Sequence, residues 1–328
     1  MRIFEETATR EALPFDLLIA RLREMFRSGC KVPARHVHIV ESETSQGTVL
    51  IMPAWTGRYL GIKTVNIYPG NSKLGLPGLF SAYTLFDATT GQVLAQMDGN
   101  VITSRRTAAA SALAASYLAR KESKRLLVVG AGRVGSLLPR AYAEVFDLQA
   151  IDIWDRTGSV AEAVAQSLAV DGLPAMAVAD LRDATTQADI VSCATLATSP
   201  VISGNWLRPG THLDLIGSFT PDMRESDDSA FVRASVFVDT SEALQKSGDL
   251  LGPISRGVIA LSDIEGTLAD LCEGRVNVMR RKEGRTIFKS VGTALEDLAA
   301  AIQVFEFWST REPVSAGPLE PTASNGKF

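Results

Sequence analysis

The segment 128–135, with the sequence VVGAGRVG, constrains the fold of this chain more than any other. It places three glycines directly after an apolar strand and ahead of a segment expected to be helical, 136–145. In such a unit Gly130 permits the tight turn, Gly132 lets backbone N–H groups approach a pyrophosphate, and Gly135 lets helix and strand pack closely. We therefore predict a dinucleotide site formed by Gly130, Ala131, Gly132, Arg133, Val134 and Gly135.

The kind of dinucleotide depends on the end of the next expected strand, 150–154. Asp155 follows it, where a carboxylate can accept both hydroxyls of a ribose and would repel a 2′-phosphate, which favours NADH. Arg156 and Thr157 come next and can bind that phosphate, which favours NADPH, although Arg156 can equally be a solvated turn residue. The sequence thus predicts NAD(P)H and leaves NADH and NADPH open.

Beyond residue 124 the chain alternates between short apolar strands and helices. The expected strands are 125–130, 150–154, 175–178, 190–194, 212–216 and 236–239, and the expected helices are 136–145 and 160–170. Helices between buried strands predict a doubly wound parallel sheet of the Rossmann type. Pro139 lies inside the first of these helices, where it should bend the axis.

The N-terminal part has a different pattern. A helix is expected over 9–27, followed by strands at 37–40, 48–53, 59–66, 79–87 and 92–98. Glycine, proline and asparagine separate these strands, which predicts an antiparallel sheet in a smaller α+β domain. The Ala-rich helix that follows from Thr103 is expected to bridge the two domains.

Composition limits the class of partner. The 328 residues include 33 Lys plus Arg against 37 Asp plus Glu, and 46% are apolar. This balance offers no electrostatic footprint for nucleic acid or an anionic membrane, so we expect a small-molecule ligand. No export signal is apparent, and Cys30, Cys193 and Cys272 show no CxxC pairing, which favours a reducing, cytoplasmic location. His36 and His38 share a strand face but lack a third ligand, so no metal site is predicted.

Three cations stand out. Lys63 interrupts an apolar strand and is costly to bury without an anionic partner, although an edge strand could point it at water. Arg105 and Arg106 come just before the Ala-rich helix, where a guanidinium could hold a carboxylate, or where both could be solvated. The acidic residues give weaker indications of a functional role. Asp214 and Asp239 are expected to cap loops, and the acidic run 225–228 to be a solvated helix start.

Seven segments, taken in order, resemble the ornithine cyclodeaminase and mu-crystallin family. They are PxR at 33–35, MP at 52–53, GIKTVN at 61–66, MDGNVITSRRTAA at 97–109, VVGAGRVG at 128–135, GSFTPDMRE at 217–225 and IFKSVGTALEDLAAA at 287–301. The resemblance covers nearly the whole chain and is far more specific than the glycine loop alone.

The resemblance implies a homodimer with a split domain arrangement. It places a substrate-binding and dimerisation domain at 1–116, completed by a C-terminal helix at about 302–314, and an NAD(P)-binding domain at 117–301. The remainder, 315–328, is rich in Pro, Ser and Gly and is expected to be a disordered tail. By motif matching, Arg35, Lys63 and Arg106 fall on substrate-binding positions. Cofactor positions fall on Arg106, Thr107, Thr195, Ile216, Ser290 and Val291.

Departures from the family pattern bear on the reaction. Phe219 and Leu50 stand where ornithine cyclodeaminases carry an aspartate and a glutamate, so the acid/base groups for ammonia release are missing. Members with a similar GxFTPxMxE stretch include ketimine reductases, which implies reduction of a cyclic imine such as Δ1-pyrroline-2-carboxylate or Δ1-piperideine-2-carboxylate. Lys63 is then expected to be catalytic. The alternatives are an alanine dehydrogenase, an ornithine cyclodeaminase, and a mu-crystallin-like protein that binds NADPH and a hormone-like ligand.

Overall fold

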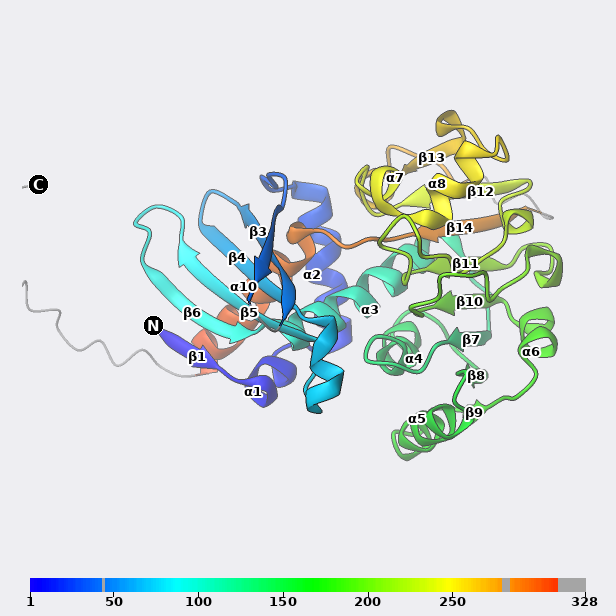
Figure 1. Cartoon of the computed structure of the whole chain (residues 1–328), viewed down its shortest axis with the longest axis horizontal. Helices are drawn as coiled ribbons and strands as arrows, with labels where there is room; N and C mark the ends of the chain where they lie inside the picture. The colour runs from blue at the N-terminus through cyan, green and yellow to red at the C-terminus, as the bar shows by residue number, and fades with distance from the viewer. Residues whose placement is uncertain (43–44, 279–283, 312–328) are drawn as a thin grey trace, which may run out of the picture.

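The computed structural model describes residues 1–42, 45–278 and 284–311, hereafter the described residues. Two α/β parts lie side by side, each built around one sheet, and helix α3 (Gly99–Leu118) runs from one to the other (Figure 1). One sheet is wholly parallel and the other mainly antiparallel. The predicted fold class, a Rossmann-type sheet beside a smaller α+β part, is therefore confirmed.

The first part holds a six-stranded sheet in the order β1-β6-β5-β4-β3-β2. Its strands are β1 (Arg2–Phe4), β2 (His36–Glu41), β3 (Gln46–Trp55), β4 (Tyr59–Ile67), β5 (Leu79–Asp87) and β6 (Val93–Asp98), with a 3-10 turn η1 (Pro69–Leu74) before β5. Neighbours from β2 to β6 pair antiparallel, as predicted. The short strand β1 was not predicted, because three residues show no alternation; it pairs parallel with β6.

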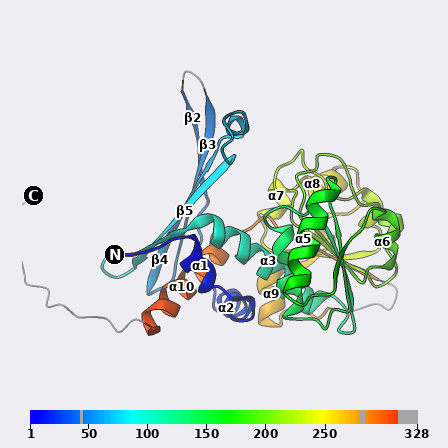
Figure 2. The ribbon, with the colours of Figure 1, turned by 90° about the horizontal axis from the view of Figure 1, so that it is seen from below.

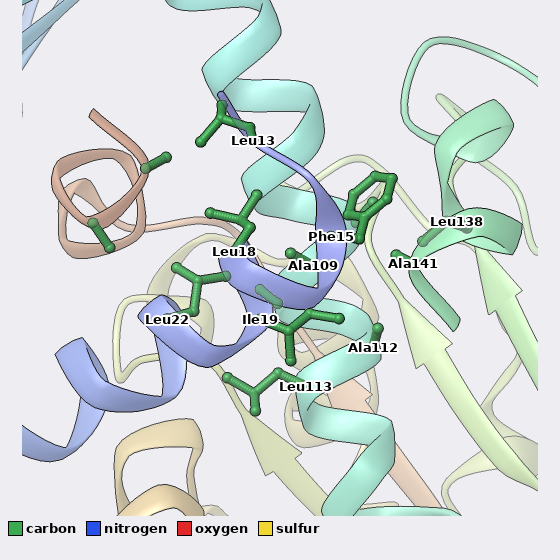
Figure 3. Packing of buried hydrophobic residues seen from close by; sticks show 14 of the residues in the cluster. Leu13, Phe15, Leu18, Ile19, Leu22, Ala109, Ala112, Leu113, Leu138 and Ala141 are labelled. Atoms are coloured by element: carbon green, nitrogen blue, oxygen red, sulfur yellow. The ribbon is translucent and has the colours of Figure 1, made fainter. Parts of the chain in front are cut away.

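The expected helix 9–27 is in fact two helices, α1 (Glu6–Glu11) and α2 (Phe15–Ser28). Pro14 separates them, because it has no N–H to donate and disfavours helical backbone at Leu13. The break turns α2 so that its apolar side faces α3. Figure 3 shows side chains of α2 meeting those of α3, with α4 (Leu138–Ala143) beside them; the labelled residues are Leu13, Phe15, Leu18, Ile19, Leu22, Ala109, Ala112, Leu113, Leu138 and Ala141.

Helix α3 is the central element of the molecule. It begins at Gly99, earlier than the expected Thr103, because the Asp98 side chain accepts a hydrogen bond from the Val101 N–H (2.8 Å) and caps the helix. Fourteen of its residues are buried, and six of these are alanine. Small side chains let α2, α4 and the C-terminal helix α10 (Ala294–Arg311) approach it closely, and Figure 2 shows α2 and α10 beside it.

The second part is an eight-stranded parallel sheet in the order β13-β12-β14-β11-β10-β7-β8-β9. Its strands are β7 (Arg125–Val129), β8 (Ala150–Trp154), β9 (Ala175–Ala177), β10 (Ile190–Cys193), β11 (His212–Leu215), β12 (Ala234–Val238), β13 (Ile264–Thr267) and β14 (Arg285–Lys289). The flanking helices are α5 (Gly158–Val170), α6 (Leu181–Gln187), α7 (Ala243–Lys246), α8 (Gly248–Ser255) and α9 (Leu268–Glu273), with 3-10 turns η3 (Gly204–Trp206), η4 (Asp228–Ala230) and η5 (Leu261–Asp263). Five of the six predicted strands lie inside their expected ranges, β12 begins at Ala234, two residues before the expected 236, and β13 and β14 are additional.

Two sequence predictions near the ends of this part need correction. The expected helix 136–145 is a 3-10 turn, η2 (Gly135–Leu137), followed by the short α4. Pro139 therefore lies in the first turn of α4, where its missing N–H has no intrahelical partner, and it does not bend a helix. The C-terminal helix α10 starts at Ala294, before the expected 302, and packs on β3 and β4.

The boundaries 1–116 and 117–301 stay predictions, and the expected tail, 315–328, lies outside the described residues. Of the helices within the described ranges, none is long and apolar enough to cross a membrane.

Candidate active site

The glycine loop has the geometry that its sequence predicts. Gly130 has φ +95°, and a Cβ there would lie 2.8 Å from the Ala194 carbonyl oxygen. A Cβ on Gly135 would lie 1.8 Å from the Gly130 carbonyl oxygen, so the turn and η2 pack too closely for any side chain. At Gly132, by contrast, nothing lies within 4 Å of the position of a Cβ. The loop thus leaves open space at the one glycine that should face a phosphate.

An outer cavity of about 320 Å³ lies beside this loop. Its lining includes Gly130, Gly132, Trp154, Asp155, Arg156, Thr157 and Val201. The Asp155 carboxylate accepts hydrogen bonds from the Ala131 N–H and the Thr157 N–H, both 2.8 Å, so it faces the glycine loop. Each of its oxygens keeps a lone pair for a ribose hydroxyl. Arg156 and Thr157 are exposed at the same cavity, so groups suited to NADH and to NADPH border one space.

An inner cavity of about 200 Å³ continues from the outer one, because Ala194, Thr195 and Leu196 line both. It lies where β7, β10, β11 and β14 end, at the carboxyl edge where such sheets bind ligands. Seven of the predicted residues line it: Arg106, Thr107, Val134, Thr195, Ile216, Ser290 and Val291. The other lining residues are Thr103, Ala194, Leu196, Gly217, Phe219 and Gly292.

Arg133 and Arg105 lie elsewhere, in a cavity on another face of α3 from the inner cavity. The Arg105 Nε donates to the Leu13 carbonyl (2.7 Å), and its guanidinium lies over the Phe15 ring. Arg105 therefore ties α3 to the break between α1 and α2, which leaves Arg106 as the arginine of the pair that reaches the inner cavity. Arg133 was predicted as a cofactor residue from the loop motif, and that role stays a prediction.

Four buried charges form an ion cluster behind the inner cavity: Lys63, Arg106, Glu296 and Asp297. The Lys63 Nζ lies 2.6 Å from Asp297 Oδ2, and the Arg106 Nε donates to Asp297 Oδ1 (2.9 Å). The Arg106 Nη1 donates to Glu296. Lys63 is 2% exposed on β4, an inner strand between β3 and β5, so the alternative of an edge-strand lysine in water is wrong.

Burial and neighbouring charges set the pKa values in this cluster. Burial lowers the pKa of Lys63 to about 8, and the Arg106 charge adds to this, while Asp297 opposes it. Burial acts to raise the pKa of Asp297, but Lys63 and Arg106 outweigh it and hold the pKa below its ordinary value. Burial raises the pKa of Glu296 to about 7 despite Arg106. The cluster therefore holds a lysine that can exchange a proton near neutral pH.

Gly292 sets the position of the Arg106 guanidinium. A Cβ on Gly292, which has φ +78°, would lie 2.6 Å from both Nη atoms. The Asp239 carboxylate caps the loop after β12, as predicted, by accepting from the Thr240 N–H (2.7 Å), and it also accepts from the Val291 and Gly292 N–H groups (2.8 and 2.6 Å). Among the described residues no hydrogen-bond acceptor contacts Arg106 Nη2, so this nitrogen can bind an anion in the inner cavity.

The structure does not place all three predicted substrate-binding residues in the lining of the inner cavity. Arg35 does not line the inner cavity; it donates to Glu242 (2.7 Å) and to the Gly292 carbonyl (3.1 Å). Lys63 lies behind the lining and reaches it through Thr103, whose Oγ1 is 3.4 Å from its Nζ. The three cations thus surround the inner cavity, but only Arg106 borders it.

The partners of these cations were missed by sequence reasoning. Glu296 and Asp297 lie in ALEDLAAA, and two acids in so apolar a helix were the available signal that they pair with buried cations.

Two sequence predictions about acidic residues were wrong. Asp214 does not cap a loop: it is fully buried in β11, where it accepts hydrogen bonds from Ser111, Tyr142 and Ser192. Glu225 is fully buried rather than solvated.

No group of three or more metal-binding side chains occurs in the described residues, and His36 and His38 stack on each other in β2, which is exposed.

Comparison with known proteins agrees with a site for a nicotinamide cofactor. A family model described as "Ornithine cyclodeaminase/mu-crystallin family" matches residues 4–312. The chain belongs to this family.

Several curated relatives are named as reductases. The chain is 41% identical to the Delta(1)-pyrroline-2-carboxylate reductase of Paracoccus denitrificans, over 85% of this chain and 89% of that one. It is 34% identical to the ketimine reductase mu-crystallin of Rattus norvegicus, over 90% and 91%.

Solved structures extend the likeness to three dimensions. One is the Delta(1)-pyrroline-2-carboxylate reductase of Thermococcus litoralis with NADH and L-proline, with TM-score 0.88 and 33% identity over 95% of this chain and 98% of that one. Another is an archaeal alanine dehydrogenase dimer with bound NAD, with TM-score 0.87 and 29% identity over 95% and 97%. The chain is thus a nicotinamide-dependent oxidoreductase by family and by fold.

Two glycine variants separate cofactor binding from folding. Gly132→Ala places a methyl group in open space, so the melting temperature should stay the same while the Kd for NADH rises at least about tenfold, because the methyl group blocks the phosphate. Gly135→Ala should instead lower stability by about 1–3 kcal/mol through its clash. Thermal unfolding and NADH titration measure both. Unchanged NADH affinity in Gly132→Ala would place the pyrophosphate elsewhere.

Proposed function

We propose that this oxidoreductase reduces a cyclic imine carboxylate, Δ1-pyrroline-2-carboxylate or Δ1-piperideine-2-carboxylate, to L-proline or L-pipecolate. The observation that carries the proposal is the pairing of the Arg106 guanidinium, which lines the inner cavity together with Val134 of the glycine loop, with the buried Lys63 behind it. The reductase names of the relatives and the NADH and L-proline in the Thermococcus structure support it.

The carboxylate of the substrate is the group that Arg106 would hold. Its Nε and Nη1 donate to Asp297 and Glu296, which orient the guanidinium, and among the described residues no acceptor contacts Nη2. Arg35 adds positive charge from beyond Gly292. Fixing the carboxylate fixes the adjacent imine carbon, and such orientation can lower a barrier by roughly 7–11 kcal/mol.

The imine nitrogen is the group that Lys63 would serve. An iminium accepts hydride far better than a neutral imine, and a lysine with a pKa of about 8 is still largely protonated at neutral pH. Because Asp297 also contacts Arg106, the two cations are held as a unit. The bound nicotinamide supplies the hydride itself. We leave the choice of NADH or NADPH to measurement, since Asp155 borders the outer cavity together with Arg156 and Thr157.

The lining favours reduction over the alternatives. No carboxylate is among the described residues that line the inner cavity, and Phe219 borders it where cyclodeaminases carry an aspartate. Release of ammonia from ornithine would need such a group. Alanine dehydrogenase activity stays a second candidate, because the archaeal dehydrogenase superimposes almost as well. A hormone-binding protein without turnover would not require a lysine such as Lys63 that can exchange a proton.

A substrate screen tests the proposal. Purified protein is mixed with NADH or NADPH and with pyrroline-2-carboxylate, piperideine-2-carboxylate, pyruvate plus ammonia, or ornithine. We expect cofactor oxidation with a cyclic imine to exceed that with pyruvate and ammonia by at least about tenfold. Release of ammonia from ornithine would overturn the argument from Phe219, and an absence of turnover with every substrate would favour the binding protein.

Lys63→Met tests the proton role. Loss of a general acid typically lowers the rate by about 10²–10⁴-fold, and NADH binding should persist. In the unaltered protein kcat/KM should fall as the pH rises through about 8, because the pKa of Lys63 is lowered to that value and the neutral amine has no proton to give. The variant should lack this step, and exposed Lys121→Met should keep it. Undiminished imine reduction by a Lys63→Met protein that binds NADH would contradict the role.

We also propose that the protein is a homodimer in the cytoplasm. Helices cover one face of the six-stranded sheet, and within residues 1–42, 45–278 and 284–311 no helix covers the opposite, bare face. The register places Ile3, Val49, Ile51, Pro53, Ile62 and Phe80 on that bare face, and none of them is buried. So apolar a sheet face is typical of a subunit interface, and the archaeal relative is described as a dimer. Cys30, Cys193 and Cys272 are all free, which suits a reducing compartment.

A charge on this face tests the dimer. Ile51→Lys should convert a dimer into a monomer, because an ammonium would have to be buried between two sheets. Light scattering after size exclusion should report twice the chain mass for the unaltered protein and once for the variant. Val170→Lys, on exposed α5, is the matched control and should remain dimeric. A monomer from the unaltered protein would end the proposal.

A further inference from the structure

Glu225 is a fully buried carboxylate whose hydrogen bonds all go to the cavity walls. Its Oε1 accepts from the Thr195 N–H (2.7 Å) and from the Thr195 hydroxyl (2.9 Å). Its Oε2 accepts from the Gly217 N–H (2.6 Å). Thr195 follows β10 and Gly217 follows β11, so one side chain joins the segments after two adjacent strands.

One of the segments that Glu225 joins lines both cavities, and the other lines the inner cavity. Thr195 lines the inner and the outer cavity, and Gly217 lines the inner one. They are close together: a Cβ on Gly217 would lie 1.9 Å from the Thr195 carbonyl oxygen and 2.5 Å from Glu225 Oε1. Glu225 therefore sets the distance between the two segments at the point where the cavities meet.

The backbone of Glu225 is itself held in place. Its carbonyl accepts from the Val201 and Ile202 N–H groups, both 2.9 Å. Its N–H donates to Asp249 Oδ1 (3.0 Å), and the other Asp249 oxygen lies 3.8 Å from the buried Lys289 Nζ. Burial raises the pKa of Glu225 to about 8, and the Lys289 charge and the backbone donors at Thr195 and Gly217 offset only part of the cost of burying it.

We propose that Glu225 is a positioning residue for the nicotinamide cofactor. It acts through Thr195 and Gly217, whose spacing defines the passage from the outer to the inner cavity. The Thr195 hydroxyl donates its one proton to Glu225 and already accepts from the Ala197 N–H (3.3 Å), so at the passage this oxygen can only accept, through its remaining lone pair. Groups that donate, such as a ribose hydroxyl or a carboxamide N–H, are the chemistry that this oxygen selects.

Glu225→Gln tests this positioning role, hereafter the brace between Thr195 and Gly217, with almost no change in side-chain volume. The amide N–H₂ must then face a donor, either the Gly217 N–H or Thr195, and the two segments move apart. We expect the Kd for NADH to rise at least tenfold while the binding stoichiometry stays near one per chain. Titration is done well below the melting temperature, because a merely structural loss would lower the stoichiometry and leave the Kd unchanged. That second pattern would overturn the proposal.

Two further variants sharpen the test. Asp228→Asn alters the same acidic run but at the surface, where the carboxylate pairs with Arg224 and Arg256, and it should bind NADH like the unaltered protein. Thr195→Val removes the hydroxyl through which Glu225 acts, so Glu225→Gln should weaken NADH binding less in that background. Full additivity of the two changes would contradict the brace.

The NADH-binding experiment does not depend on the proposed reaction. Only a turnover experiment rests on the proposed function. With a cyclic imine, Glu225→Gln should raise the KM for NADH at least tenfold and change the KM for the imine less than threefold. If the imine is no substrate but the Kd for NADH still rises, the proposed function fails and the brace survives. An unchanged Kd in a protein that reduces the imine fails the brace alone.

Discussion

The buried ion cluster is the interaction on which the rest of the molecule depends. Lys63 comes from a strand of the first sheet, Arg106 from the bridging helix, and Glu296 with Asp297 from the C-terminal helix. Each charge would be prohibitively costly inside the protein alone, and breaking a buried pair typically costs about 3–5 kcal/mol. The cluster is satisfied only when all three elements meet. The constraint that places α10 against β4 and α3 is therefore the same one that orients the guanidinium on the inner cavity.

What the sequence could predict follows from how local each signal is. The glycine loop, Asp155 and the alternating strands involve residues close together in the chain, and their structures match the expectation. Lys63 could be identified as unusual, but its partner lies at the other end of the chain, and a lone apolar strand does not say whether it is an edge. Glu225 shows the opposite failure. An acid among other acids suggests water, and only the fold reveals that strand ends converge on it.

The two cavities explain how one scaffold can serve related reactions in this family. The outer cavity and the glycine loop are built from backbone groups and one carboxylate, which suit the common cofactor. The inner cavity is bordered by small and apolar side chains apart from Arg106 and three threonines. Under the proposed function, substrates with a carboxylate next to a reducible carbon would bind at the Arg106 end, and Phe219, which lines the same cavity, supplies no acid for release of ammonia.

The chain passes between the two parts twice, through α3 and through the residues that join β14 to α10 (Figure 1). These crossings touch, because Gly292 packs directly against Arg106. The two parts are also joined by the packing of α2 against α9 and by the ion pair between Arg35 and Glu242. The Arg106 guanidinium therefore lies in a joint that several elements hold, and an anion bound to it would contact both parts of the molecule at once.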